Sequence, residues 1–160
     1  ALAVARPELL ASVVIANSSS YYPDRAPWQG RVERVQAQGV AAIPTGAVAR
    51  WLTPEFAATA DGAALAKKLH DTLVETDPQG YIAACQGVAA IDFRESNRKI
   101  GRPTLVIAGA RDEATPPAMS QAMVAAIPGA KLASIEAAHL SAVERPAEFV
   151  QLLKSFFGAL

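Results

Sequence analysis

The sequence predicts an α/β protein in which a parallel β-sheet with flanking helices is interrupted by a helical insert. Short apolar runs at residues 12–17, 103–109 and 131–135 predict the sheet. Strands of a parallel sheet are covered on both faces, so they form apolar runs rather than alternating patterns. The insert is predicted at residues 24–97, which contain helix-like segments and no strand-like alternation.

The chain divides into a core segment at residues 1–23, a helical cap at 24–97 and a second core segment at 98–160. The first segment opens like the end of a helix, and Pro7 should terminate that helix because proline disfavours helical conformation in the residue before it. Residues 12–17 then form the first strand, which we expect to be buried on both faces.

The cap begins within a loop that we place at residues 21–28. Its first helix is expected to start at Arg31, and Pro44, Pro54 and Pro78 divide the rest into short segments. Proline is favoured at the first helical position. We therefore interpret the cap as several short helices, each beginning near a proline.

The last core segment alternates strand, helix, strand and helix, which is typical of a parallel α/β unit. The strands are residues 103–109 and 131–135, and helices begin near Thr115 and at Pro146. The expected apolar side of the final helix consists of Phe149, Leu152, Leu153, Phe156 and Phe157.

The composition is that of an ordinary soluble protein, with 51% apolar and 19% charged residues in 160. Fifteen basic and fifteen acidic residues cancel, which argues against binding to nucleic acid or an anionic membrane. No apolar run approaches the roughly 20 residues needed to span a bilayer. The single cysteine, Cys85, fits a reducing compartment, so we expect a cytoplasmic protein. We interpret Cys85 as a buried helix residue rather than a nucleophile.

Asp112 and His139 are the candidate catalytic residues. Each follows a predicted strand of the last core segment, and ligands of parallel sheets bind beyond the carboxyl ends of the strands. There the carboxylate would hold one tautomer of the imidazole and stabilise its protonated form. Taken alone, Asp112 could be a capping carboxylate and His139 an ordinary loop histidine. Their order and their positions after neighbouring strands favour a catalytic pair.

The segments around these two residues resemble those of α/β-hydrolases. Residues 103–112 with Thr115-Pro116 are similar to the acid segment of that superfamily, and residues 138–141 with 144–146 to its histidine segment. Within the superfamily the chain resembles 3-oxoadipate enol-lactonases. This resemblance extends through the helical cap, and its further carriers are residues 14–19, 50–53, 80–85 and 89–94.

The resemblance implies a cofactor-free serine hydrolase that converts a small lactone, 3-oxoadipate enol-lactone, to 3-oxoadipate in aromatic catabolism (the β-ketoadipate pathway). His139 would act as general base and then acid, oriented by Asp112. The carboxylate of the lactone would be received by Arg31, Arg34 or Arg50, because guanidinium pairs with carboxylate in a bidentate way. The alternative for each arginine is a solvated helix face. Trp51 is a candidate wall of an apolar substrate pocket.

The nucleophile of the family has no counterpart in the chain. That nucleophile is a serine in a Gly-x-Ser-x-Gly elbow, and none of the nine serines has glycines two residues before and after it. Ser18, Ser19 and Ser20 follow a strand without such glycines, so we interpret them as loop residues. We therefore expect a companion chain or a missing N-terminal segment to carry the serine, and this chain alone to be inactive.

The other candidates for chemistry are weaker. His70 lies in a charged helical stretch and is interpreted as part of a solvated face. Two distant histidines and one cysteine provide no spacing typical of a metal site, so we expect no metal and no cofactor. Two other functions stay open: a different α/β-hydrolase, such as an esterase or haloperoxidase-like enzyme, and a non-catalytic binding module.

Overall fold

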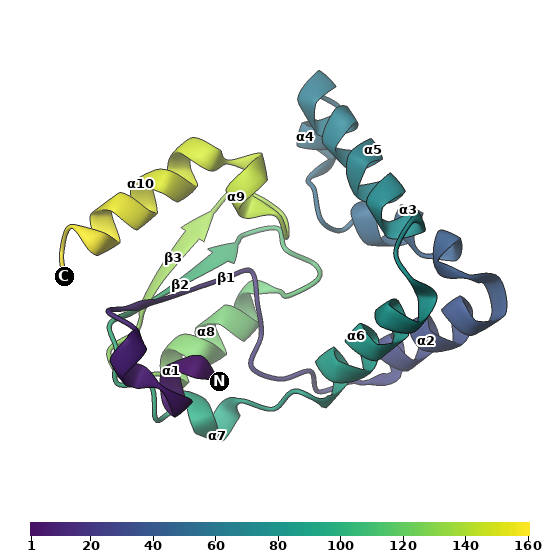
Figure 1. Cartoon of the computed structure of the whole chain (residues 1–160). Coiled ribbons are helices and arrows are strands. Elements are labelled where there is room, and N and C mark those ends of the chain that lie inside the picture. The colour runs from purple at the N-terminus through teal and green to yellow at the C-terminus, as the bar shows by residue number, and fades with distance from the viewer. The chain divides into compact units, whose positions relative to one another are not determined.

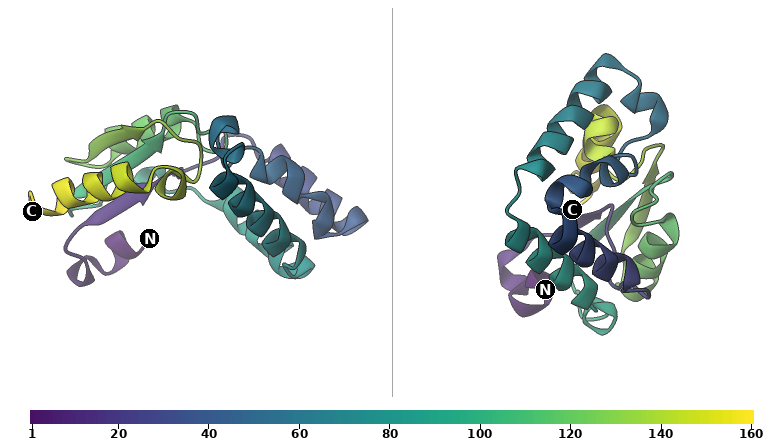
Figure 2. Two further views of the ribbon diagram at one scale, coloured as in Figure 1. Left: turned by 90° about the horizontal axis from the view of Figure 1, so that it is seen from above. Right: turned by 90° about the vertical axis from the view of Figure 1, so that its right-hand side faces the viewer.

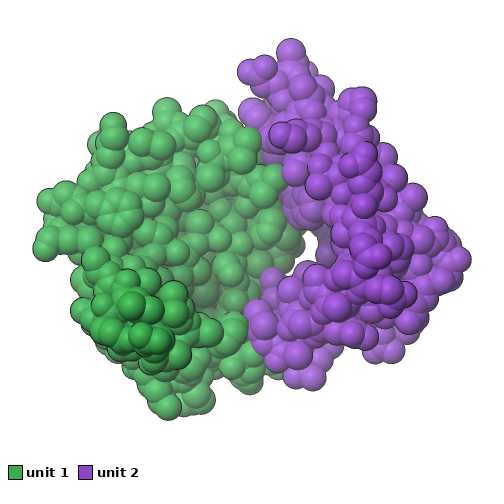
Figure 3. Space-filling view, viewed as in Figure 1, with its two compact units in different colours: residues 1–21, 92–160 green, residues 22–91 purple.

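The computed structural model describes all residues from 1 to 160 and divides them into two compact units. One unit consists of residues 1–21 and 92–160 and the other of residues 22–91, as the colours in Figure 3 show. That one unit serves as the core of an enzyme and the other as its cap remains a prediction. We refer to these parts as the sheet unit and the helical unit.

Three parallel strands form the sheet: β1 (Val13–Ala16), β2 (Thr104–Gly109) and β3 (Lys131–Ile135). Their order is β1-β2-β3, with β2 in the middle (Figure 1). The register pairs Ile15 with Val106 and Ile107 with Ala133. The three strands predicted from the sequence are confirmed, and β3 has the predicted bounds.

The two faces of β2 contact different helices. On one face Val106 packs with Met123 of α8 (Pro117–Ala126) and with Ile127, the residue that follows this helix. On the other face Ile107 packs with Phe156 of α10 (Pro146–Phe157), the yellow helix of Figure 2. Successive residues of a strand point to opposite faces. Each face therefore has its own apolar cluster, and β2 is buried along its whole length.

The sheet unit also contains four short elements: α1 (Leu2–Ala5), a 3₁₀ turn (Pro7–Leu9), α7 (Arg94–Asn97) and α9 (Ser141–Glu144). The first helix ends before Pro7, as predicted. The final helix begins at Pro146, also as predicted. No helix in the structure combines the length and the apolar character that crossing a membrane requires.

Two expectations about burial in the sheet unit are wrong. The strand β1 is only partly buried, because it lies at an edge of this sheet and has a neighbouring strand on one side only. Phe157, assigned to the apolar side of the last helix, is 50% exposed. Its neighbour Phe156, which is only 8% exposed, is the residue of this pair that belongs to the buried cluster.

The helical unit contains α2 (Ala26–Gln38), a 3₁₀ turn (Val40–Ala42), α3 (Pro44–Val48), α4 (Pro54–Ala57), α5 (Ala60–Val74) and α6 (Pro78–Ala90). Its buried cluster consists of Val35, Val40, Ile43, Ala47 and Ile82. Prolines begin α3, α4 and α6, as the sequence predicts. The first helix starts earlier than expected, because Pro27 occupies its first turn rather than a loop.

Candidate active site

Asp112 is placed by a turn that leads from β2 to α8. The backbone N–H of Asp112 donates to the carbonyl of Gly109 at 3.2 Å. A Cβ on Gly109 would lie 2.4 Å from the carbonyl oxygen of Ala138 and 2.7 Å from that of Ala137. Real Cβ atoms do not approach backbone so closely, so glycine allows the segment before His139 to pass against the end of β2.

The structure brings Asp112 and His139 together. The Nδ1 atom of His139 lies 2.9 Å from Oδ2 of Asp112. The Asp112 side chain is fully buried, whereas that of His139 is 24% exposed. Because an ionised carboxylate only accepts hydrogen bonds, Nδ1 carries the proton of the neutral imidazole. The other ring nitrogen, Nε2, is therefore available to accept a proton from a reacting group.

The Asp112 carboxylate accepts further hydrogen bonds from the turn that follows it. The N–H groups of Ala114 and Thr115 donate to Oδ1 at 2.8 and 2.9 Å. The Thr115 hydroxyl donates to Oδ2 at 2.8 Å. Burial acts to raise the pKa of Asp112, but the hydrogen bonds from His139 and Thr115 outweigh it and lower the pKa from 3.8 to about 2. The carboxylate is thus held ionised at neutral pH.

Asn17, at the end of β1, connects the acid with the segment before the histidine. Its Nδ2 lies 3.2 Å from Oδ2 of Asp112 and 3.2 Å from the carbonyl oxygen of Ala138. Its Oδ1 accepts a hydrogen bond from the hydroxyl of Ser141. The backbone of Asn17 has a φ of 45°, a left-handed conformation in which asparagine is enriched.

Glu144 and Arg145 support the segment on either side of His139. The buried Glu144 carboxylate accepts a hydrogen bond from the N–H of Ala138 at 3.2 Å. The Nε of Arg145 donates to the carbonyl of Glu136 at 3.1 Å. These contacts tie α9 and its C-terminal end to the loop that carries the histidine.

Sequence reasoning identified the pair but not its supporting residues. The sequence assigns no supporting role to Thr115, Ser141 or Glu144, which lie in family-like segments, or to Asn17, which ends the first strand and lies in the family-like segment 14–19. The position of Asn17 in the sequence indicates where its side chain lies. It follows a parallel strand as Asp112 and His139 do, so its side chain could have been expected at the same edge of the sheet.

The three candidate arginines lie on one groove of the helical unit. Arg31, Arg34 and Arg50 line a space of about 490 Å³ between α2 and α3, which we call the arginine groove; its other lining residues are Pro27, Gly30, Ile43, Gly46 and Ala47. The Arg31 guanidinium carbon lies 4.7 Å from the ring centroid of Trp28. The Nε of Arg50 donates to the carbonyl of Gly46 at 3.2 Å. Trp51 packs against the buried cluster of this unit and is not among the residues that line the groove.

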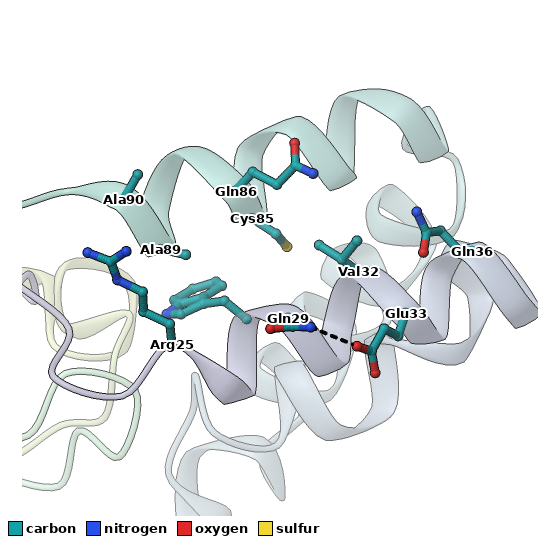
Figure 4. Close-up of a pocket in the computed structure, with 10 residues that line it drawn as sticks. Arg25, Gln29, Val32, Glu33, Gln36, Cys85, Gln86, Ala89 and Ala90 are labelled. Atoms are coloured by element: carbon teal, nitrogen blue, oxygen red, sulfur yellow. Dashed lines mark hydrogen bonds between the residues drawn. The ribbon is translucent and has the colours of Figure 1, made fainter.

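A second groove lies between α2 and α6 and measures about 460 Å³ (Figure 4). Cys85 lines it but is only 3% exposed, which confirms the interpretation of Cys85 as a buried helix residue. Burial raises the pKa of the Cys85 thiol, so the nucleophilic thiolate is disfavoured. His70 on α5 has a side chain that is 44% exposed, and its Nδ1 lies 3.3 Å from a carboxylate oxygen of Asp71.

The serines that follow β1 satisfy local hydrogen bonds. The Ser19 hydroxyl donates to the carbonyl of Tyr21 at 2.7 Å and accepts from its N–H at 3.1 Å. The Ser20 hydroxyl accepts from Nδ2 of Asn97 at 2.5 Å. These contacts agree with the interpretation of Ser19 and Ser20 as loop residues.

The pKa of Asp112 makes the stability of the sheet unit depend on pH. Since the folded-state pKa is depressed, this carboxylate stabilises the fold above about pH 4, and the contribution of about 2 kcal/mol is lost as pH falls toward 2. Urea unfolding at pH 6 and pH 2.5 should show a smaller drop in the free energy of unfolding for Asp112→Asn than for the wild type. Equal drops would contradict this assignment, because the other carboxylates are common to both proteins.

Known proteins resemble the chain over nearly its whole length. It is 35% identical over 148 residues to 3-oxoadipate enol-lactonase 2 of Acinetobacter baylyi, which is 92% of this chain and 55% of that protein. It is 34% identical over 149 residues to 3-oxoadipate enol-lactonase 1 of the same organism, at 93% and 55% coverage. The chain thus spans a little over half the length of these relatives. None of the protein-family models matches it.

Solved structures establish the fold. The enol-lactonase of Burkholderia xenovorans superimposes with a TM-score of 0.91 at 27% identity, covering 98% of this chain and 60% of that one. A hydrolase from Pseudomonas aeruginosa gives a TM-score of 0.89 at 32% identity, covering 98% and 59%. The chain therefore has the fold of the carboxyl-terminal part of an α/β-hydrolase and resembles the 3-oxoadipate enol-lactonases.

Proposed function

We propose that the chain contributes the acid and the histidine of a serine hydrolase that opens a lactone ester, with 3-oxoadipate enol-lactone as substrate. The observation that carries the proposal is the hydrogen bond of 2.9 Å between the buried Asp112 and the partly exposed His139. The similarity to enol-lactonases, which includes the helical unit, supports the choice of substrate.

In the proposed reaction, Nε2 of His139 accepts the proton of a serine hydroxyl while the serine oxygen attacks the lactone carbonyl. Asp112 stabilises the imidazolium that forms. The imidazolium then returns the proton to the leaving enol oxygen, and the ring opens to give an acyl-enzyme. A water molecule attacks the acyl group, again with His139 as base, and the imidazolium returns the proton to the serine oxygen as the product leaves. The enol formed by ring opening tautomerises to the ketone of 3-oxoadipate.

The nucleophile in this proposal lies outside the chain. Its nine serines lack the Gly-x-Ser-x-Gly pattern, and the chain spans 55% of the length of the enol-lactonases it matches. We propose that a preceding segment or a companion chain supplies the serine and the donors of the oxyanion hole. On this proposal the chain by itself hydrolyses nothing.

The arginine groove is the proposed binding site for the carboxylate of the substrate. Three guanidinium groups, those of Arg31, Arg34 and Arg50, line a space of about 490 Å³, within the range of about 300–1,000 Å³ that is usual for small-ligand sites. Charge-assisted hydrogen bonds from arginine to carboxylate are strong and geometrically specific. Trp51 stays a predicted wall of the substrate pocket.

Replacing His139 by alanine in the complete enzyme should lower the rate of lactone hydrolysis at least about 1,000-fold, because the serine loses its base. Hydrolysis is followed by the loss of absorbance of the enol-lactone, with simple esters as a comparison panel. His70→Ala is the matched control, since His70 lies on α5 and pairs with Asp71. Wild-type turnover by the His139 variant would exclude the proposed role. A preference for simple esters would keep the hydrolase and reject the lactone as substrate.

The source of the nucleophile is identified by intact mass spectrometry of every polypeptide in the purified sample, with and without a fluorophosphonate probe. We expect a companion chain or a longer polypeptide to gain the mass of one probe, because the activated serine lies outside these 160 residues. A probe adduct on one of the nine serines of this chain would contradict that expectation. A sample with no adduct and no turnover would favour a non-catalytic binding module.

Replacing Arg31 or Arg50 by alanine should raise KM for the carboxylate-bearing lactone about 10- to 100-fold, the effect of losing a charge-assisted hydrogen bond. The KM for an uncharged ester should not change. Glu33→Ala, on the same helix but outside the arginine groove, is the control. Equal effects on charged and uncharged substrates would show that the arginines serve the fold rather than the carboxylate.

A further inference from the structure

Asn17 occupies a position where three parts of the sheet unit meet. It follows β1, and its side chain reaches Asp112 beyond β2, Ala138 beyond β3 and Ser141 at the start of α9. These partners are 95, 121 and 124 residues away in the sequence. Thr115, in the same turn as Asp112, also contacts both partners, since its hydroxyl lies 2.8 Å from Oδ2 of Asp112 and 3.4 Å from Nδ1 of His139.

The hydrogen-bond partners fix which way the Asn17 amide points. The Asp112 carboxylate and the Ala138 carbonyl can only accept hydrogen bonds, so both require the NH₂ group of the amide. The Ser141 hydroxyl can donate, and it therefore faces the amide oxygen. Turning the amide over would place its oxygen 3.2 Å from two acceptors. Each partner thus supports the same orientation.

We propose that Asn17 is a positioning residue for the Asp112–His139 pair, holding the carboxylate and the histidine loop at one fixed separation. Its NH₂ group bridges Oδ2 of Asp112, the oxygen that also accepts from His139, and the carbonyl of Ala138, the residue before His139. The catalytic meaning of this role rests on the proposed hydrolase function, but the geometry does not.

The bridge acts on the tautomer of the histidine. Nδ1 keeps its proton only while Oδ2 of Asp112 stays in line with it, and Oδ2 can rotate away if its other donors are lost. The Thr115 hydroxyl restrains Oδ2 from the side of its own turn. Asn17 restrains it from β1 and simultaneously restrains the loop that carries the imidazole, so it couples the two partners across the end of the sheet.

The Asn17→Gly variant tests the side-chain amide without disturbing the backbone conformation of residue 17. Glycine adopts a φ of 45° without steric cost, so this variant removes the side-chain bridge while leaving the turn unstrained. The second variant, Ser141→Ala, removes the hydroxyl that donates to Oδ1 of the same amide. Ser18→Ala, next to Asn17 but outside the bridge, is the matched control.

The ring nitrogens of the histidines report the result directly in the chain itself. With only two histidines in the sequence, ¹H–¹⁵N correlation spectra of the imidazole rings resolve His139 from His70, and His70 is an internal reference in the helical unit. We expect neutral His139 of the wild type and of Ser18→Ala to carry its proton on Nδ1. In Asn17→Gly the tautomer with the proton on Nε2 should appear, and in Ser141→Ala to a smaller extent.

In the complete enzyme, Asn17→Gly should lower kcat about 10- to 100-fold, the usual effect of removing a supporting hydrogen bond, with KM unchanged. Asn17→Asp keeps the shape and the acceptor for Ser141 but replaces the donor, so it should not restore kcat. A purely structural Asn17 would instead lower the melting temperature and leave tautomer and kcat as they are. That outcome, or wild-type tautomers in both Asn17→Gly and Ser141→Ala, would overturn the proposal. The tautomer result stands even if His139→Ala disproves the hydrolase function.

Discussion

The ionised carboxylate of Asp112, buried at the end of the central strand, is the constraint on which the site depends. A charge removed from water costs several kcal/mol unless hydrogen bonds replace its hydration. Here two backbone N–H groups saturate one oxygen, and side chains of Thr115, His139 and Asn17 surround the other. Because the hydrogen bonds from His139 and Thr115 outweigh the effect of burial, the pKa of Asp112 stays low and the anion persists. The ionised carboxylate therefore requires these hydrogen-bond donors, and they come from the segments that follow all three strands.

The parallel sheet explains why residues so far apart in the sequence can supply them. Parallel strands end at the same edge, so the segments that follow β1, β2 and β3 are neighbours in space. Gly109 allows this close approach because it has no Cβ. A Cβ there would collide with the carbonyl groups of Ala137 and Ala138 and with the Asn17 amide. Apolar packing on both faces of β2 buries the strand that this edge terminates. The geometry of the Asp112–His139 pair is in this sense a property of the sheet rather than of the loops.

Much of this arrangement could be predicted from the sequence, because the relevant signals are local. The apolar runs located the three strands, and the positions of Asp112 and His139 after two of them predicted that the side chains meet. The errors arose where the outcome depends on more distant parts of the chain. The burial of β1 depends on which strands flank it, and the start of α2 depends on whether Pro27 opens a helix or closes a loop. The bridge by Asn17 depends on a positive φ and on partners more than 90 residues away, which no local pattern encodes.

Asp112 and His139 both belong to the sheet unit. The orientation of the imidazole therefore does not depend on the group that would carry out the nucleophilic attack. The hydrogen bonds described for the two side chains all join residues of the sheet unit, so the tautomer of His139 is set before any substrate or nucleophile arrives. Preorganised groups stabilise developing charge without having to reorient during the reaction. On the proposed function, a serine from outside the chain would meet a partly exposed imidazole whose proton is already held on Nδ1. The free energy of arranging the base is then supplied by folding of the sheet unit, and only the placement of the serine and of the carbonyl remains for the rest of the enzyme.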